Sequence, residues 1–157
     1  MSSPNTSIFR TLLLAESAAN IGSIIPALFA PELALSYLVR GPSQITPATK
    51  SLMQLFGGLV VLATAPLLLS YLEERQSVEQ VIAKRRLTYA VMGISELAIG
   101  SITLAQYMQG NSGLTDQALL MATGAMAVFT AMRGYFLFVR PELIMPSSGK
   151  GSGKKLQ

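Results

Sequence analysis

Four apolar stretches constrain the fold of this chain more than any other feature of its sequence. A helix needs about 20 apolar residues to cross the hydrocarbon core of a bilayer. The stretches that meet this length are approximately Ser7–Phe29, Thr49–Leu72, Leu87–Tyr107 and Leu114–Val139. Short connections separate them, so neighbouring spans are expected to run antiparallel. The sequence therefore predicts an all-α protein, an integral membrane four-helix bundle.

The composition supports a membrane protein and excludes several kinds of chemistry. Only 13% of the residues are charged, whereas about a quarter are charged in a soluble domain. The chain has no Cys and no His, which excludes thiol nucleophiles, disulfides, haem attachment and imidazole bases. We therefore expect neither a metal site nor an organic cofactor. The basic residues lie at the ends of the spans, which indicates membrane orientation rather than nucleic-acid binding.

The distribution of basic residues predicts which way the spans run. With four spans, both termini and the middle connection lie on one side, and Arg40 and Lys50 lie on the other. The first side collects nine of the twelve basic residues, namely Arg10, Arg75, Lys84, Arg85, Arg86, Arg140, Lys150, Lys154 and Lys155. Cytosolic segments carry the excess of Lys and Arg. We predict a short cytosolic tail at residues 1–6, a membrane domain at 7–145 and a flexible basic cytosolic tail at 146–157.

The last four residues, KKLQ, bear on location. Lys154 and Lys155 stand fourth and third from the end, which resembles the dilysine retrieval signal of endoplasmic-reticulum membrane proteins. That signal is read from a cytosolic tail, where the predicted orientation places it. The alternative interpretation is a solvated basic tail without a targeting role.

Three ionisable residues inside the spans are the candidate catalytic residues. Such residues are costly in a bilayer and are usually functional or paired. Counted from the basic residue at the cytosolic end of its span, Glu16 lies roughly 9 Å deep, Arg133 roughly 10 Å and Glu96 roughly 15 Å. All three therefore lie between the cytosolic face and the midplane, where the first, third and fourth spans can bring them together.

Neighbouring polar residues extend this set into a candidate pocket. Asn20 follows Glu16 by one helical turn, Tyr89 precedes Glu96 by two turns, and Thr130 precedes Arg133 by three residues. We predict that Asn20, Tyr89 and Thr130 bind the substrate; the alternative for Asn20 and Thr130, each taken alone, is hydrogen bonding between helices. Small residues are expected to allow close helix contacts: Gly57, Gly58, Gly93, Gly100 and Gly124.

Two interpretations of the charged residues stay open. In the first, Glu16 and Glu96 form an acid–base pair oriented by Arg133: an ionised Glu activates water or a substrate hydroxyl, and a protonated Glu, or Tyr89, protonates a leaving oxygen, as in epoxide opening. In the second, a buried Glu–Arg contact only holds the spans together. The spacing of the residues is compatible with both, and a minor third interpretation is a carboxyl group that reaches the membrane surface or stays protonated without a role.

The chain as a whole resembles small four-span fungal proteins of the endoplasmic-reticulum membrane that occur in polyketide and terpenoid pathways. The similarity lies in the four spans, the early Glu16, the segment PSQITPATKSLMQLFGGL that leads into the second span, and the KKLQ ending. Some of these proteins are assigned as epoxide hydrolases or cyclases. The resemblance implies an enzyme acting on a lipophilic oxygenated substrate beside other membrane enzymes. A second resemblance is to the four-span sterol-isomerase-like fold, a class that also uses His.

Three classes of function follow from these observations. The first is a membrane-embedded hydrolase or cyclase that opens an epoxide or carries out a related cyclisation. The second is a non-catalytic lipid- or sterol-binding or scaffold protein of the endoplasmic reticulum. The third, a small transporter subunit, is disfavoured because the lumenal half of the spans offers only Gln54, Thr103 and Gln106 as polar residues. The expected partners are the bilayer and a lipophilic small molecule, and nucleic acid is not expected.

Overall fold

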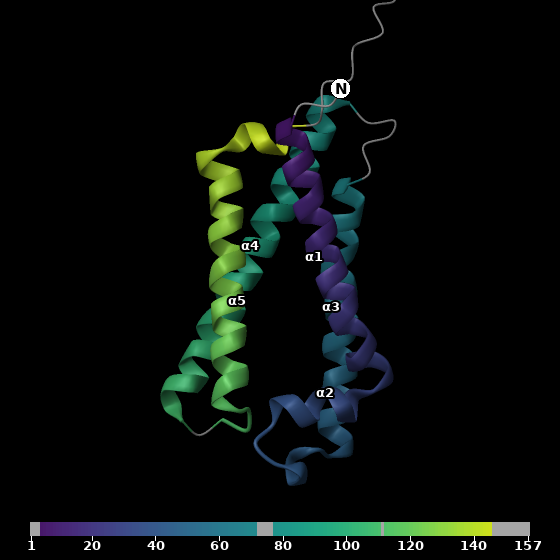
Figure 1. The fold of residues 1–157 in the computed structure, drawn as a ribbon, viewed down its shortest axis with the longest axis vertical. Coiled ribbons are helices and arrows are strands. Elements are labelled where there is room, and N and C mark those ends of the chain that lie inside the picture. The colour runs from purple at the N-terminus through teal and green to yellow at the C-terminus, as the bar shows by residue number, and fades with distance from the viewer. Residues whose placement is uncertain (1–3, 72–76, 111, 146–157) are drawn as a thin grey trace, which may run out of the picture.

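The computed structural model describes residues 4–71, 77–110 and 112–145, and this part of the chain is almost entirely helical (Figure 1). The described residues form no β-strand apart from one isolated bridge. The elements are α1 (Pro4–Phe29), α2 (Pro31–Leu38), η1 (Pro42–Gln44), α3 (Pro47–Tyr71), α4 (Val78–Gln109), α5 (Asp116–Gly134), the π-helix η2 (Tyr135–Val139) and η3 (Pro141–Ile144). The predicted all-α class is confirmed.

Four of these helices are long and apolar enough to cross a membrane: α1, α3, α4, and α5 together with η2. Their surfaces reverse the pattern of a soluble protein. Large apolar side chains such as Leu62, Ile94 and Phe138 are exposed, whereas Glu96 and Arg133 are buried. Apolar side chains are stable on an outer surface that faces lipid, and charged ones are not. The four predicted spans therefore correspond to the four long helices.

The third span begins earlier than its apolar stretch predicted. Helix α4 starts at Val78, not near Leu87. A capping box starts it, because Ser77 Oγ accepts a hydrogen bond from the Gln80 amide and the Gln80 side chain accepts one from the Ser77 amide. Apolar composition marks only the part of a helix that lies in lipid, whereas the cap decides where the helix starts.

The long helices form two hairpins, which meet at one end and diverge toward the other. Helix α1 packs along α3, and α4 packs along α5. Figure 1 shows the two pairs close together where α1 and α4 begin, and far apart toward α2. We call these the N-terminal end and the α2 end of the bundle. Contacts between the hairpins are few, so the residues that make them decide how the spans are held.

An aromatic core seals the N-terminal end. The ring centroids of Phe9 and Phe136 are 5.6 Å apart, and those of Phe9 and Tyr89 are 5.2 Å apart. The buried guanidinium of Arg85 lies 4.8 Å from the centre of the Phe9 ring and donates hydrogen bonds to the carbonyls of Ser70 and Ile144. These contacts join α1, α3, α4, η2 and η3, so this end is firmly closed.

A smaller contact joins the two hairpins at the α2 end. Arg40 Nη2 lies 2.6 Å from Asp116 Oδ1, and the Arg40 amide donates to the Gly113 carbonyl at 3.1 Å. An isolated bridge pairs Val39 with Leu114. The segment after α2 is therefore bonded to the connection between α4 and α5, so the hairpins are joined at both ends of the bundle.

Only some of the predicted glycine contacts are present. A Cβ on Gly57 would lie 2.9 Å from Leu28 Cδ2 and 3.1 Å from Ala27 Cβ, so α1 and α3 approach closely there. A Cβ on Gly100 would lie 3.1 Å from Met126 Cβ, whereas one on Gly93 would be in ordinary contact with Arg133, at 3.6 Å from its Cδ. A Cβ on Gly58 or Gly124 would have no neighbour within 4 Å. The prediction was wrong for these two; Gly58 directly follows Gly57, and a helix turns successive residues to different sides.

This difference between adjacent glycines gives a matched test of the α1–α3 contact. Gly57→Val is expected to lower the free energy of unfolding by about 1–3 kcal/mol, because the new side chain overlaps Leu28 and Ala27. Gly58→Val makes the same change in helix propensity one residue away, and we expect an effect of only about 0.5 kcal/mol. Thermal unfolding in detergent measures both. Equal losses would show that α1 and α3 are not in close contact at Gly57.

Candidate functional site

Three charged side chains from three helices meet inside the bundle. Arg133 Nε, from α5, donates to Glu96 Oε1 at 2.9 Å and to Oε2 at 2.7 Å, and Arg133 Nη2 donates to Glu96 Oε1 at 2.6 Å. The same Nη2 also donates to Glu16 Oε1, from α1. All three residues are buried. This charged cluster, Glu16, Glu96 and Arg133, links the two hairpins within the spans.

Helix α4 provides the surface that holds the arginine. The aliphatic part of Arg133 lies against Gly93, where a Cβ would be 3.6 Å from Arg133 Cδ. Its guanidinium lies 4.8 Å from the centre of the Tyr89 ring, in a geometry that favours a cation. Tyr89, Gly93 and Glu96 follow one another at helical spacing and therefore lie on one face of α4. This face fixes the position of the guanidinium.

The two carboxylates are held differently. Glu96 accepts three hydrogen bonds from Arg133, whereas Glu16 accepts one. Glu16 Oε2 and Arg133 Nη1 are buried and have no hydrogen-bond partner among the described residues. Glu96 is therefore the firmly fixed member of the charged cluster, and Glu16 has the freer carboxyl group.

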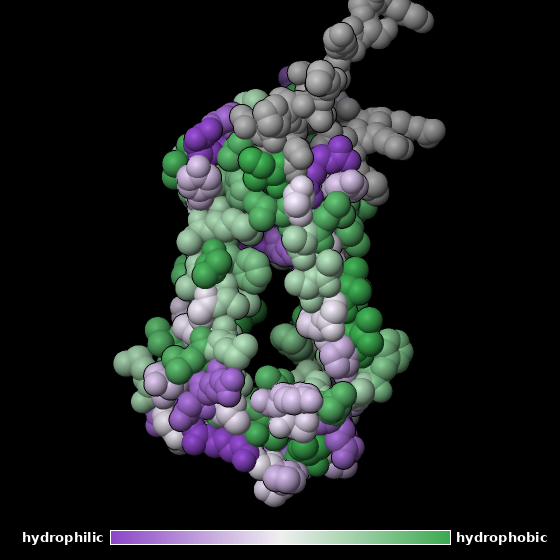
Figure 2. Space-filling model, viewed as in Figure 1, coloured by the Kyte–Doolittle hydropathy of each residue, from purple (hydrophilic) through white to green (hydrophobic). Residues whose placement is uncertain are grey.

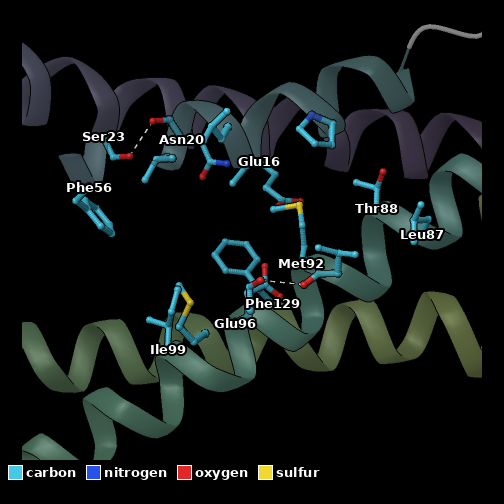
Figure 3. Close-up of a pocket in the computed structure, with 17 residues that line it drawn as sticks. Glu16, Asn20, Ser23, Phe56, Leu87, Thr88, Met92, Glu96, Ile99 and Phe129 are labelled. Atoms are coloured by element: carbon cyan, nitrogen blue, oxygen red, sulfur yellow. Dashed lines mark hydrogen bonds between the residues drawn. The ribbon is translucent and has the colours of Figure 1, made fainter. Parts of the chain in front are cut away.

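A cavity of about 660 Å³ lies between the hairpins beside the charged cluster. Its volume is in the range of small-molecule sites. Glu16 and Glu96 contribute to its wall, which is otherwise mostly apolar, and Figure 3 shows Phe56, Met92, Ile99 and Phe129 around it. In Figure 2 an opening passes between the two halves of the molecule, with hydrophilic residues at its upper margin. In a membrane, this opening would face the bilayer.

The structure divides the six residues of the predicted pocket. Glu16, Glu96 and Asn20 line the cavity, and Arg133 lies behind the two carboxylates. Tyr89 and Thr130, predicted to bind the substrate, do not line it. Tyr89 is fully buried in the aromatic core because its ring packs beneath Arg133. The Tyr89 ring thus lies against the Arg133 guanidinium and outside the cavity wall, and the substrate-binding role of Tyr89 and Thr130 stays a prediction.

Sequence reasoning missed several residues of the cavity wall. Ser23 lies two turns after Glu16 on α1, a spacing that could have revealed it. Phe56 and Phe129 carry no such signal, because aromatic residues are common in apolar spans. The missed polar and aromatic wall residues are Ser23, Phe56, Thr88, Ser95 and Phe129.

Two further predictions concern a metal site and cellular targeting. The described residues contain no group of three or more Asp, Glu, His or Cys side chains that could hold a metal ion. Lys154 and Lys155, the predicted retrieval signal, lie outside the described residues.

Comparisons with protein-family models, curated proteins and solved structures found no match. The resemblance to fungal membrane proteins of polyketide and terpenoid pathways therefore stays a prediction. Evidence about function comes from the geometry of this chain.

Proposed function

We propose that the protein is a membrane-embedded hydrolase or cyclase that opens an epoxide, or carries out a related cyclisation, on a lipophilic substrate without a cofactor. The observation that carries this proposal is the unequal carboxylate pair in the cavity wall. Arg133 holds Glu96 with three hydrogen bonds and Glu16 with one. Acid–base catalysis needs one carboxyl group that gives a proton and one that accepts a proton.

The net charge of the cluster supports this division of roles. Two ionised carboxylates and one guanidinium would bury one net negative charge, which is costly in a bilayer. The cluster is neutral when one carboxyl group holds a proton. Glu96 is the ionised member in this proposal because it accepts three hydrogen bonds from the guanidinium whereas Glu16 accepts one, and Glu16 holds the exchangeable proton.

The proposed reaction uses both carboxyl groups. Glu16 gives its proton to the epoxide oxygen as a C–O bond breaks and the bonding electron pair moves to that oxygen. Water, or a hydroxyl of the substrate, attacks the carbon and gives its proton to the Glu96 carboxylate. The proton then passes from Glu96 to Glu16 and restores the starting state; the two carboxyl groups are neighbours because both Oε1 atoms accept hydrogen bonds from Arg133 Nη2. Water as nucleophile gives a diol, and a substrate hydroxyl gives a cyclic ether.

A direct test uses a lipophilic epoxide and the protein in lipid nanodiscs, in water labelled with oxygen-18. Hydrolysis produces a diol that carries one labelled oxygen, and cyclisation produces an isomer of the substrate without label. Mass spectrometry distinguishes the two products. A conversion rate no higher in the wild type than in a Glu16→Gln variant would overturn the proposal.

A second candidate function is non-catalytic binding of a lipid or sterol, or a scaffold role. It is favoured by the pairing of both carboxylates with Arg133, which links the hairpins, and by the apolar wall of the cavity. Under this alternative, the protein would bind the epoxide without converting it.

We also propose that the protein resides in the endoplasmic-reticulum membrane with both termini in the cytosol. The support is the distribution of basic residues and the KKLQ ending. Other membrane enzymes of the same pathway would be its partners there.

The orientation can be tested with glycosylation tags. A tag fused before Met1 is expected to stay unmodified, because the N-terminus would be cytosolic. A tag inserted at Ser112, between α4 and α5, is expected to be modified in the lumen. Gel mobility before and after deglycosylation measures both. The reverse pattern would contradict the orientation and would also remove the dilysine interpretation.

A further inference from the structure

We propose that the cavity beside the charged cluster and a second cavity at the α2 end form a single site. Its ligand would be an uncharged, elongated amphiphile that enters from the bilayer. The second cavity, of about 510 Å³, is bounded by α2, α3 and the connection between α4 and α5. Phe56 belongs to the walls of both cavities. Such an amphiphile would be the substrate class of the proposed function. The ligand site rests on that function only where its ligand is taken to be the substrate.

Asn20 identifies where the polar group of the ligand would lie. Its side chain points into the cavity in Figure 3 and makes no hydrogen bond to another described residue. Each other polar side chain of the wall has at least one partner: Glu16, through Oε1, and Glu96 with Arg133, Ser23 with the Asn20 carbonyl, Ser95 with the Val91 carbonyl, and Thr88 with Ser70. A carboxamide in an apolar cavity is costly to leave unpaired. A ligand hydroxyl, carbonyl or ether oxygen would satisfy it.

The charges around the cavity favour an uncharged ligand. Glu16 and Glu96 contribute acidic groups to the wall, and the residues that line the cavity include no Lys or Arg. Arg133 already donates to both carboxylates. A carboxylate or phosphate on the ligand would therefore lie beside the ionised Glu96, and no lining residue offers a cation to pair with it, which disfavours binding. An ammonium group on the ligand is disfavoured as well, because the cluster proposed above is neutral and offers it no net negative charge.

The dimensions favour an elongated ligand. Along α4 the first cavity extends from Leu87 to Ile99, which is about 18 Å at the helical rise. Beyond Phe56 the second cavity continues with an apolar wall that includes Leu35, Leu52 and Met53. Phe56 thus stands where the apolar part of a ligand would pass from one cavity to the other, and its ring would limit the length that fits.

Photoreactive probes can test the headgroup preference in nanodiscs. Three probes share one saturated sixteen-carbon tail with a diazirine and differ only in an alcohol, a carboxylic acid or an amine headgroup. The alcohol is expected to label residues that line the two cavities, and to do so on the order of tenfold more than the acid at equal concentration. Labelling is read by mass spectrometry of peptides. Equal labelling by alcohol and acid, or a preference for the amine, would overturn the proposal.

Two variants test the residues that carry the inference. Asn20→Leu is expected to reduce alcohol labelling about fivefold, the effect of one lost hydrogen bond, whereas Ser101→Leu, on an exposed part of α4, should not change it. Phe56→Ala should raise labelling by a twenty-two-carbon alcohol relative to the sixteen-carbon one. Unchanged labelling in Asn20→Leu, or an unchanged ratio in Phe56→Ala, would contradict the single site.

The outcomes separate this inference from the proposed function. If the alcohol probe labels the cavities with the expected preferences but no Glu16-dependent conversion of an epoxide occurs, the ligand site stands and the enzyme proposal fails. If conversion depends on Glu16 but labelling shows no effect of headgroup or of Asn20, the enzyme proposal stands and this inference fails.

Discussion

Replacing Arg133 with Met is expected to lower the free energy of unfolding by about 3–5 kcal/mol, the usual cost of removing one partner from a buried ion pair. The change leaves Glu16 and Glu96 buried without the guanidinium that donates to both. It also removes the link between the hairpins within the spans. Methionine keeps most of the aliphatic contact with Gly93, so the decrease in the free energy of unfolding measures the effect of removing the charge. Thermal and denaturant unfolding in detergent measure it.

Arg40→Met is the matched control for this prediction. Arg40 also pairs with a carboxylate across the hairpins, but its side chain is 42% exposed and that of Asp116 is 60% exposed. Exposed ion pairs contribute only about 0–1 kcal/mol, so the control should stay close to wild type. Adding Glu16→Gln and Glu96→Gln to Arg133→Met should restore part of the stability, since the cluster then holds no charge. Equal losses for Arg133→Met and Arg40→Met, or no restoration, would contradict this role of the cluster.

The four spans could be predicted from sequence because the apolar length that crosses a bilayer is a local property. The helix ends could not be predicted this way. The first turns of α4 include Lys84 and Arg85, so a count of apolar residues excludes them, although the capping box at Ser77 already starts the helix. Arg85 itself was counted only as a cytosolic charge. Its burial depends on carbonyls of α3 and η3, which lie far from it in sequence.

The meeting of Glu16, Glu96 and Arg133 could be expected from sequence because depth along a span follows from residue number. The inequality of the two carboxylates could not. It depends on which nitrogen of Arg133 faces each helix, and the contacts with Gly93 and Tyr89 decide this. The same contacts place the Tyr89 ring beneath the guanidinium instead of in the cavity wall. Spacing along one helix predicts which residues share a face, but it does not predict which residue of another helix packs against that face.

The structural and catalytic interpretations of the cluster both require Arg133, but they give Glu16 different roles. A purely structural cluster needs each carboxylate for the hydrogen bonds that it accepts, so Glu96, with three, would matter more than Glu16, with one. A catalytic cluster needs Glu16 for its proton, whatever its contribution to stability. Activity and stability measured on the same variants therefore separate the two interpretations.

Glu16→Gln is expected to reduce turnover of a lipophilic epoxide on the order of a hundredfold or more, the contribution of a positioned general acid. Glutamine keeps the size and can still accept the hydrogen bond from Arg133, but it cannot give a proton. The variant also removes one of the two carboxyl groups, so the cluster is neutral when Glu96 is ionised and Arg133 is protonated. We therefore expect its unfolding temperature to stay near that of the wild type. Initial rates and thermal unfolding, measured on the same preparation, give both quantities.

Two further variants complete this test. Glu96→Gln should reduce turnover by a similar factor but also lower stability, because Arg133 loses the carboxylate to which it donates three hydrogen bonds. Glu32→Gln changes an exposed carboxylate that pairs with Lys50, and we expect it to leave turnover unchanged. A Glu16→Gln protein that loses stability but converts the epoxide at the wild-type rate would reject the catalytic role. The carboxyl group of Glu16 would then serve only to complete the link between the hairpins.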